Sequence, residues 1–192
     1  MSEVPTLIIV PGWQNSGPGH WQSLMAQQWP GAVCVQQKNW ESPEKTEWVD
    51  AIAQTIMNQP GKVVVAAHSL GCIATAHLPS QVTKRIHGAL LVAPAEPLRH
   101  EVLANFAPVP QALLPYRSIV VGSTNDPYCP LNVVRKYARA WGSEMVCLKN
   151  AGHINVDSGF GRWPAGENLL QSIFDEMTAR DLYVYGLLAA LG

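Results

Sequence analysis

Six short runs of aliphatic and β-branched residues recur along the chain, and segments with helical spacing lie between most of them. The runs are Thr6–Val10, Ala32–Val35, Lys62–Ala67, Ala89–Val92, Ser118–Val121 and Glu144–Leu148. They are apolar almost throughout and do not alternate between apolar and polar positions, which is typical of parallel strands covered on both faces. The pattern therefore predicts a mostly parallel sheet of about six strands.

Helical spacing marks the segments between and after these strands. The predicted helices are His20–Gln28, Lys45–Met57, Leu70–His77, Leu131–Trp141 and Asn168–Leu182. In the second of them, Trp48, Ile52 and Ile56 fall on one face. Ser42 as a cap and Pro43 at the first helical position are expected to mark its start. Strands that alternate with helices predict an α/β sheet with right-handed crossovers and helices on both faces.

The chain length limits the number of domains. A chain of 192 residues buries one sizeable core but is too short for two domains of typical size, so we expect one domain over residues 1–192. Residues 94–117 form a long connection with five prolines, which has the length of a short lid or binding loop. The apolar residues 168–191 should mostly cover the sheet, although residues 183–191 could instead form an oligomer contact. A monomer and a homodimer therefore both stay open.

Composition and charge narrow the class of partner. Hydrophobic residues make up 47% of the chain, charged residues 14%, and the formal net charge is −1. This balance excludes a disordered chain and provides no basic surface for a nucleic-acid partner. No basic leader precedes an apolar signal core, and no segment approaches the roughly 20 apolar residues that span a bilayer. We therefore expect a cytoplasmic protein with no membrane partner.

The four cysteines, at positions 34, 72, 129 and 147, are scattered and form no CxxC pair. We interpret them as buried free thiols in a reducing cytosol, because neither a disulfide framework nor a zinc site is indicated. The histidines also lack close ligand spacing. No metal is therefore expected.

The segment VVVAAHSLG, residues 63–71, places Ser69 between a buried strand and a helix, with small residues two positions to either side. This is the pattern of a nucleophile elbow, in which a strained turn raises a Ser hydroxyl above the strand end. Ala67 stands where the pattern usually has Gly. The first amide N–H of the following helix, that of Leu70, could stabilise an oxyanion. A plain helix-capping Ser is the alternative interpretation.

A Ser nucleophile needs a base and an acid. His153 lies just beyond the last predicted strand, in the segment NAGHIN, and Asp126 lies just beyond the fifth, in VVGSTNDP. Because functional crevices lie at the carboxyl ends of parallel strands, both side chains could reach Ser69. The order Ser, Asp, His is that of the α/β-hydrolases. A surface His and a turn-forming Asp are the simpler alternatives.

The loop after the first strand, PGWQNSGPGHW at residues 11–21, is rich in glycine. It cannot bind phosphate as a P-loop does, because Pro18 and Gly19 replace the required Lys and Ser or Thr. The dinucleotide fingerprint is also absent, so no cofactor is expected. The backbone N–H of Trp13 could instead supply the second oxyanion donor, opposite Leu70. Simple packing of the Trp13 ring is about equally consistent with the pattern.

These segments resemble the RBBP9/YdeN family of small serine hydrolases within the α/β-hydrolase superfamily. The resemblance covers nearly the whole chain and rests on IIVPG at 8–12, HSLGC at 68–72, NDPY at 125–128, GHIN at 152–155 and GFGRWPAG at 159–166. It implies a single-domain α/β-hydrolase without a large cap domain, a Ser69, Asp126 and His153 triad, and esterase-like activity on small acyl substrates.

The sequence therefore predicts a serine hydrolase that cleaves small acyl esters through an acyl-enzyme. Thioesters and amides stay open as alternative substrates. The expected pocket walls are Trp13, His68, Leu98, Phe106 and Trp163. The first alternative is a binding protein on a hydrolase scaffold, because a fold alone does not establish activity. A nucleotide-binding domain is a weaker alternative, since its glycine fingerprint and phosphate cation are missing.

Overall fold

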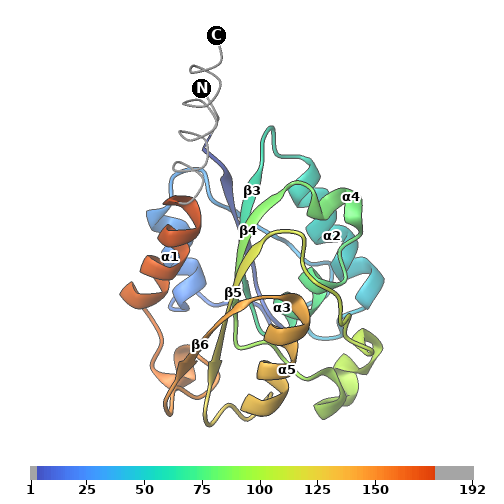
Figure 1. Ribbon diagram of the computed structural model, residues 1–192, viewed down its shortest axis with the longest axis vertical. Helices are drawn as coiled ribbons and strands as arrows, with labels where there is room; N and C mark the ends of the chain where they lie inside the picture. The colour runs from blue at the N-terminus through green and yellow to red at the C-terminus, as the bar shows by residue number, and fades with distance from the viewer. Residues whose placement is uncertain (1–3, 176–192) are drawn as a thin grey trace.

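The computed structural model describes residues 4–175, and its centre is a six-stranded sheet in the order β2-β1-β3-β4-β5-β6 (Figure 1). The strands are β1 (Thr6–Val10), β2 (Val33–Cys34), β3 (Val63–His68), β4 (Ile86–Val92), β5 (Arg117–Ser123) and β6 (Glu144–Leu148). Every neighbouring pair is parallel. The predicted parallel sheet is confirmed, and β4 begins three residues earlier than expected.

The connecting helices also follow the prediction, with one addition. They are α1 (Trp21–Gln28), α2 (Lys45–Met57), α3 (Leu70–Ala76), α4 (Ser80–Thr83) and α5 (Leu131–Trp141). The short helix α4 is the one that the hydrophobic pattern does not predict. Residues 164–175 are helical up to the last described residue, so the predicted helix Asn168–Leu182 begins earlier than expected. Its remaining part, and the candidate oligomer contact at 183–191, lie outside the described residues.

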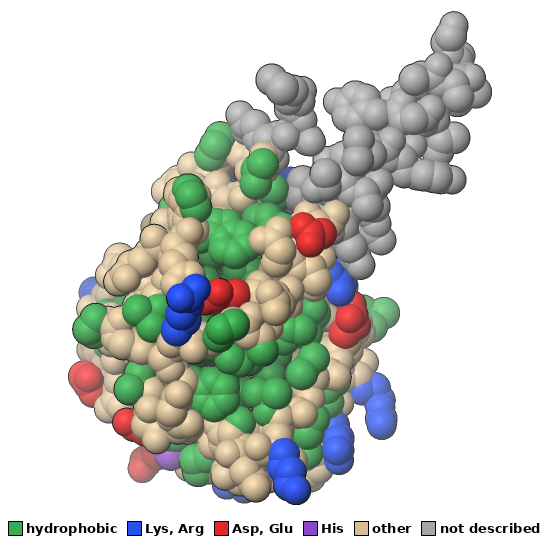
Figure 2. All heavy atoms as spheres, turned by 90° about the vertical axis from the view of Figure 1, so that its left-hand side faces the viewer, with side chains coloured by type: hydrophobic (Ala, Val, Ile, Leu, Met, Phe, Trp, Pro, Cys, Tyr) green, Lys and Arg blue, Asp and Glu red, His purple; other side chains and the backbone are tan. Residues whose placement is uncertain are grey.

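Two hydrophobic cores lie on opposite faces of the sheet, each beneath a layer of helices. Figure 1 shows these helices on the two faces. On one face α2, α3 and α5 bury residues such as Trp48 and Trp141. On the other face α1 and residues 164–175 bury Trp21 and Ile173. Figure 2 shows the molecule from the side on which α1 lies, and hydrophobic side chains are visible across the centre of that surface. The layers are those of a single-domain α/β-hydrolase.

The start of α2 corrects a sequence prediction. The helix begins at Lys45 and neither Ser42 nor Pro43 caps it. The Lys45 N–H donates to Asn105 Oδ1 at 2.9 Å, and Asn105 Nδ2 donates to the Pro43 carbonyl at 3.0 Å. A side chain 60 residues away therefore satisfies the helix terminus. Local spacing cannot show such a contact.

Asn105 belongs to the long connection between β4 and β5, which packs on the core through Leu103 and Phe106. It contains two short 3-10 helices, η1 (Pro97–Arg99) and η2 (Glu101–Phe106). Phe106 is fully buried, and its ring lies edge-on to Trp48 at 6.1 Å between centroids. The connection thereby ties the second half of the sheet to α2.

The prediction that all four cysteines are buried is wrong for two of them. Cys72 and Cys129 are buried, whereas Cys34 and Cys147 are exposed, and all four are free thiols. Cys34 lies on β2 and Cys147 on β6, the two edges of the sheet. Edge strands are only partly covered, so their apolar sequence does not bury them fully. Within residues 4–175 no helix is long and apolar enough to cross a bilayer.

Candidate active site

Ser69 occupies a strained turn between β3 and α3. Its φ of 53° and ψ of −121° lie in a region that non-glycine residues avoid, at a cost of about 1–3 kcal/mol. The turn is held from both sides, since the Ser69 N–H donates to the Val92 carbonyl at 3.0 Å and the Ser69 carbonyl accepts from the Cys72 N–H at 3.0 Å. The arrangement is that of a nucleophile elbow.

Two glycines allow the end of β1 to approach this turn closely. A Cβ atom at Gly71 would lie 2.5 Å from the Val10 carbonyl oxygen and 2.6 Å from that of Pro11. A Cβ atom at Gly12 would lie 2.8 Å from the Cβ of Ser69. Because most of these neighbours are backbone atoms, a side chain at either position cannot be accommodated without moving the chain. The close approach sets the loop after β1 directly beside the Ser69 hydroxyl.

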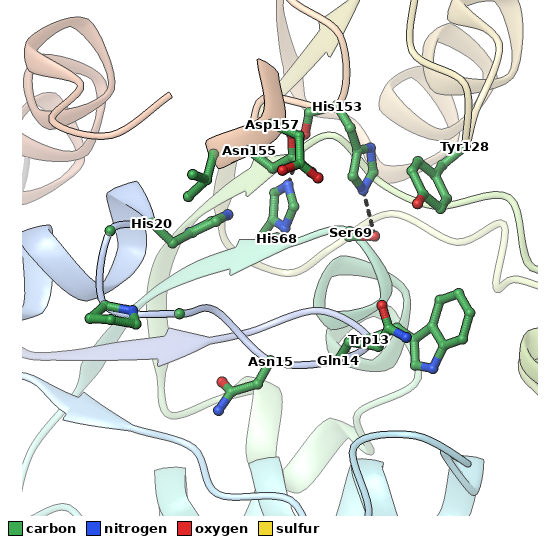
Figure 3. Close-up of a pocket in the computed structure, with 14 residues that line it drawn as sticks. Trp13, Gln14, Asn15, His20, His68, Ser69, Tyr128, His153, Asn155 and Asp157 are labelled. Carbon is green, nitrogen blue, oxygen red and sulfur yellow. Dashed lines mark hydrogen bonds between the residues drawn. The ribbon is translucent and has the colours of Figure 1, made fainter. Parts of the chain in front are cut away.

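His153 and Asp126 complete a hydrogen-bonded chain with Ser69, and Figure 3 shows the part of it between His153 and Ser69. His153 Nε2 lies 2.9 Å from Ser69 Oγ. On its other side, His153 Nδ1 lies 2.9 Å and 3.0 Å from the two carboxylate oxygens of Asp126. All three residues are buried. The carboxylate accepts the Nδ1 proton, which leaves Nε2 as the acceptor for the Ser69 hydroxyl.

Side-chain oxygens hold the backbone of the loop that carries His153, residues 150–158. Three consecutive amide N–H groups donate to them: Ala151 to Ser123 Oγ at 3.0 Å, Gly152 to Asn125 Oδ1 at 2.8 Å, and His153 to Ser158 Oγ at 3.1 Å. The Asp126 carboxylate is itself oriented, because its Oδ1 accepts the Tyr128 N–H at 2.8 Å. The relative position of base and acid is therefore fixed by the two loops that follow β5 and β6.

Two buried rings hold the same loop through its carbonyl groups. His68 Nε2 lies 2.9 Å from the His153 carbonyl, and Trp21 Nε1 donates to the Ile154 carbonyl at 3.0 Å. A carbonyl only accepts, so His68 carries its proton on Nε2. Burial and, secondarily, the nearby His153 charge keep the pKa of His68 well below its ordinary value. His68 is therefore a neutral anchor for the His153 loop.

The candidate oxyanion donors lie on opposite sides of Ser69. Leu70 is the first residue of α3, so its N–H has no acceptor inside the helix. Trp13 follows Gly12 in the loop after β1, and its indole N–H donates to the Glu41 carbonyl at 3.0 Å. Within residues 4–175 neither the Trp13 amide nor the Leu70 amide meets a hydrogen-bond acceptor. Both amides are available to a ligand.

A cavity of about 440 Å³ opens at Ser69 (Figure 3). The residues that line it are Trp13, Gln14, Asn15, Gly17, Pro18, Gly19, His20, His68, Ser69, Tyr128, His153, Asn155, Val156 and Asp157. Trp13 and Tyr128 form its aromatic part, and the Tyr128 ring lies 4.3 Å from that of His153. Among the lining residues, Asp157 is the one Asp, Glu, Lys or Arg. The cavity is therefore polar, with little charge.

The structure brings five of the sequence-predicted residues to this cavity: Ser69, His153, Trp13 and His68 line it directly, and Asp126 lies behind His153. It does not bring Leu98, Phe106 or Trp163 there. Leu98 is 75% exposed on the connection, Phe106 lies in the core against α2, and Trp163 packs on Trp21. The predicted pocket walls are corrected at these three positions, because apolar character alone does not distinguish core, surface and pocket.

Sequence reasoning missed His20, Tyr128 and Asn155 as lining residues. Tyr128 and Asn155 belong to segments that carried the family resemblance and lie two positions after Asp126 and His153, and His20 lies in the glycine-rich loop after the first strand. That proximity to the candidate triad was the available signal. Among the described residues, no three His, Cys, Asp or Glu side chains gather as a metal site.

The fold and the hydrogen-bonded Ser69, His153 and Asp126 place this protein in the class of α/β-hydrolases. The serine hydrolase family model matches residues 7–172, so the chain belongs to that family. A YdeN-like hydrolase from Pectobacterium atrosepticum is 33% identical, with a TM-score of 0.81 over 88% of this chain and 90% of that one. These findings identify a small serine hydrolase of the YdeN type.

More distant structures share the fold. The ydeN gene product from B. subtilis is 19% identical, with a TM-score of 0.74 over 89% of this chain and 99% of that one. Thermogutta terrifontis esterase 2, in a structure phosphorylated by paraoxon, is 19% identical with a TM-score of 0.60 over 96% and 84% of the two chains. A search of curated proteins finds no match.

Proposed function

We propose that the protein is a carboxylesterase-like enzyme that hydrolyses small acyl esters through a Ser69 acyl-enzyme. One observation carries the proposal: Ser69 Oγ lies 2.9 Å from His153 Nε2, while Asp126 binds His153 Nδ1 at 2.9 Å. A Ser hydroxyl is a weak nucleophile until an adjacent base takes its proton, and this geometry provides that base. The partner is then a small-molecule acyl substrate, and a cytoplasmic location stays a prediction.

In the first half of the proposed reaction, Ser69 Oγ attacks the ester carbonyl carbon as its proton passes to His153 Nε2. The carbonyl oxygen becomes an oxyanion, which accepts hydrogen bonds from the Trp13 and Leu70 amides. Asp126 stabilises the imidazolium without taking its proton. When the tetrahedral intermediate collapses, the bond to the alkoxy group breaks and His153 protonates the leaving alcohol.

In the second half, water replaces the alcohol. His153 takes a proton from the water as its oxygen attacks the acyl carbon, and then returns a proton to Ser69 Oγ as the ester bond to the enzyme breaks. The products are an alcohol and a carboxylic acid. Thioesters and amides follow the same steps with a different leaving group, so the mechanism also covers them.

The size of the cavity and the residues that line it favour small substrates. A cavity of about 440 Å³ is near the lower end of the range for small-molecule sites. The connection between β4 and β5 contributes none of its lining, so no long acyl tunnel is built from that segment. Esterases among the structural neighbours support the choice of esters over the other acyl compounds.

The test is turnover of p-nitrophenyl acetate by the wild type and by Ser69→Ala and His153→Ala. Each substitution should lower kcat by about 10³-fold or more and leave at most a small residual rate, because the triad acts as a unit. Ser69→Ala should also abolish covalent labelling by a fluorophosphonate probe. Ser80→Ala changes an exposed Ser at the start of α4 and should retain both turnover and labelling.

The outcome separates the enzyme from the alternative of a binding protein. Turnover that survives Ser69→Ala would show that another group is the nucleophile. A wild type without turnover or labelling would favour the binding protein on a hydrolase scaffold. Loss of turnover in both variants, with retention in Ser80→Ala, supports the proposed mechanism.

A further inference from the structure

Two buried imidazoles that the proposed mechanism does not use line the cavity beside Ser69. His20 and His68 are each 5% exposed, and their ring centroids lie 4.8 Å apart (Figure 3). Buried polar groups normally have hydrogen-bond partners, so a nitrogen that faces a cavity without one is a candidate ligand contact. In each ring one nitrogen has a hydrogen-bond partner within the protein, and the other has none among the described residues.

His20 presents a donor. It is the N-cap of α1, and its Nδ1 accepts the Gln22 N–H at 3.2 Å. A backbone N–H can only donate, so Nδ1 carries no proton and the neutral ring is protonated at Nε2. Within the described part of the chain, Nε2–H meets no acceptor. His20 therefore offers an unused N–H to the cavity.

His68 presents the complementary acceptor. Its Nε2–H is committed to the His153 carbonyl at 2.9 Å, so the lone pair of the neutral ring is on Nδ1. No donor among residues 4–175 reaches that Nδ1. A Cβ atom at Gly12 would lie 3.5 Å from this nitrogen and 2.8 Å from the Ser69 Cβ, so the nitrogen lies close to Ser69.

Burial keeps both rings neutral at ordinary pH. Burial and, secondarily, the charge of His153 lower the pKa of His20 to about 4. Burial, His153 and His20 together, in that order, hold the pKa of His68 well below its ordinary value. Neither ring then carries a positive charge that would attract a carboxylate or phosphate, and Asp157 at the cavity adds a negative one.

We propose that His20 Nε2–H and His68 Nδ1 form a polar subsite that binds a neutral hydroxyl or carboxamide group of the substrate, close to the ester that Ser69 attacks. This proposal rests on the proposed function, because the subsite acts in catalysis only if Ser69 attacks an ester bound beside it. A hydroxyl oxygen accepts from His20 and its proton is donated to His68. A carboxamide does the same with its C=O and N–H.

Groups that only accept hydrogen bonds, or that do neither, cannot satisfy both nitrogens. A methyl group leaves a donor and an acceptor unpaired in a buried site, which is costly. A carboxylate could accept a hydrogen bond from His20, but its second oxygen carries no proton to donate to His68 Nδ1, so two acceptors would face each other. An ether also offers only an acceptor. The subsite therefore selects substrates in which one group both donates and accepts.

The first test compares isosteric esters that differ by OH for CH₃. One pair places the hydroxyl on the acyl side, p-nitrophenyl glycolate against p-nitrophenyl propionate. The other places it on the alcohol side, 2-hydroxyethyl acetate against propyl acetate. Each kcat/KM is divided by the rate of hydroxide-catalysed hydrolysis to remove intrinsic reactivity. We expect the hydroxyl ester to be favoured roughly 10-fold in one pair. Equal values in both pairs would overturn the proposal.

Two substitutions remove the nitrogen proposed to bind substrate and keep the hydrogen bond that the other nitrogen of the same ring makes within the protein. His20→Asn retains a capping acceptor for the Gln22 N–H but has no Nε2 donor. His68→Gln retains an N–H within reach of the His153 carbonyl but has no Nδ1 acceptor. Each should lower the preference for the hydroxyl ester to about 2-fold or less. The preference is a ratio within one preparation, so partial loss of folded protein cancels.

His77→Asn is the matched control. His77 is half-buried, and its Nε2 contacts the Phe106 carbonyl at 2.9 Å, away from the cavity. This variant should keep the wild-type preference. If His20→Asn and His68→Gln keep it as well, the two imidazoles do not contact the substrate hydroxyl.

A second measurement does not depend on catalysis. The Ser69→Ala protein is titrated with ethyl glycolate and 2-hydroxyethyl acetate, and with their CH₃ counterparts ethyl propionate and propyl acetate, and the imidazole nitrogen resonances are followed by NMR. One of the two hydroxyl esters should shift His20 Nε2 and His68 Nδ1, and its CH₃ counterpart should not. Equal shifts, or none at either nitrogen, would overturn the subsite. Specific shifts in a protein whose wild type lacks turnover would retain the subsite and reject the esterase.

Discussion

The turn that carries Ser69 and the loop that carries His153 face each other across 2.9 Å, yet different forces hold them. Backbone contacts hold the turn, since two backbone hydrogen bonds fix Ser69 and Gly71 leaves no room for a Cβ atom beside the Val10 and Pro11 carbonyls. Hydrogen bonds with side chains hold the loop, including those with Asn125 and His68. Close backbone packing therefore sets one half of the site, and side-chain hydrogen bonds set the other.

This difference decides how each half should respond to change. Steric exclusion is short-ranged and indifferent to pH, so the turn should fail abruptly when volume is added. The polar contacts are individually modest and include buried titratable rings, so the loop should loosen in steps and respond to acid. Three perturbations, arranged from the largest expected effect to the smallest, test this contrast.

The largest effect is expected from added volume at the turn. Gly71→Ala sets a methyl group 2.5 Å from the Val10 carbonyl oxygen, so β1 and α3 must separate. We expect a loss of about 3 kcal/mol in unfolding free energy, a fall of about 6–12 °C in Tm, and nearly complete loss of ester turnover. Thermal unfolding followed by circular dichroism, together with p-nitrophenyl acetate kinetics, measures all three.

Gly161→Ala is the control for the same substitution without a clash. A Cβ atom there would lie 3.5 Å from the Gly19 carbonyl, which is ordinary van der Waals contact. Its Tm should stay within about 2 °C of the wild type. A Gly71→Ala protein with wild-type Tm and turnover would show that the turn is not set by steric exclusion.

Acid should act through the buried imidazole of His20, whose ring packs against that of His68, one of the anchors of the His153 loop. The ordinary pKa of His is 6.5, and that of buried His20 is about 4, so the unfolded chain binds a proton that the folded chain refuses between these values. Stability is therefore complete above about pH 6.5 and falls as the pH drops toward 4. At about pH 5 the His20 contribution alone amounts to a loss of about 2 kcal/mol.

Urea unfolding near neutral pH and near pH 5 measures this effect in the wild type and in His20→Asn. The variant should lose less stability on acidification by about 2 kcal/mol, and the carboxylates common to both proteins cancel in the comparison. Parallel losses in the two proteins would show that His20 is not held neutral. The acid response would then have to be assigned to other groups.

The same contrast explains how far the sequence could predict the site. The elbow is contiguous, and its small residues at Ala67 and Gly71 are visible in one segment. The strand ends place Asp126 and His153 on the correct edge because parallel strands share a direction. The anchors of the His153 loop include Ser123, Asn125 and His68, which are all far from the loop in the sequence, and no periodicity links them to it.

Pocket walls and helix starts were predicted less well for the same physical reason. Leu98 and Phe106 are both apolar residues of one connection, but one is 75% exposed and the other fully buried. Which of them faces solvent depends on how η2 docks against α2 and α3. The cap that Asn105 provides to α2 depends on the same docking. Local patterns specify elements well, whereas contacts between elements require the assembled fold.

The smallest effect should follow the loss of a single polar contact in the His153 loop. Asn125 Oδ1 accepts two hydrogen bonds, from the Gly152 N–H at 2.8 Å and from Ser123 Oγ at 2.9 Å. Asn125→Ala should lower the unfolding free energy by about 1–2 kcal/mol and kcat by about 10-fold, because the base is no longer held at its distance from Ser69. Fluorophosphonate labelling should slow to a similar extent without being abolished.

Asn105→Ala separates the effect on the base from the effect on stability. Asn105 also bridges two segments through its side chain, accepting the Lys45 N–H at 2.9 Å and donating to the Pro43 carbonyl at 3.0 Å, but it does so at the start of α2. The unfolding free energy of Asn105→Ala should fall by a similar amount, about 1–2 kcal/mol, which is the usual effect of losing one helix cap. Its kcat should stay within about 2-fold of the wild type. Equal kcat losses in the two Asn variants would mean that the rate follows overall stability. A kcat loss confined to Asn125→Ala would show that the rate depends on the polar contacts that hold His153 and not on overall stability.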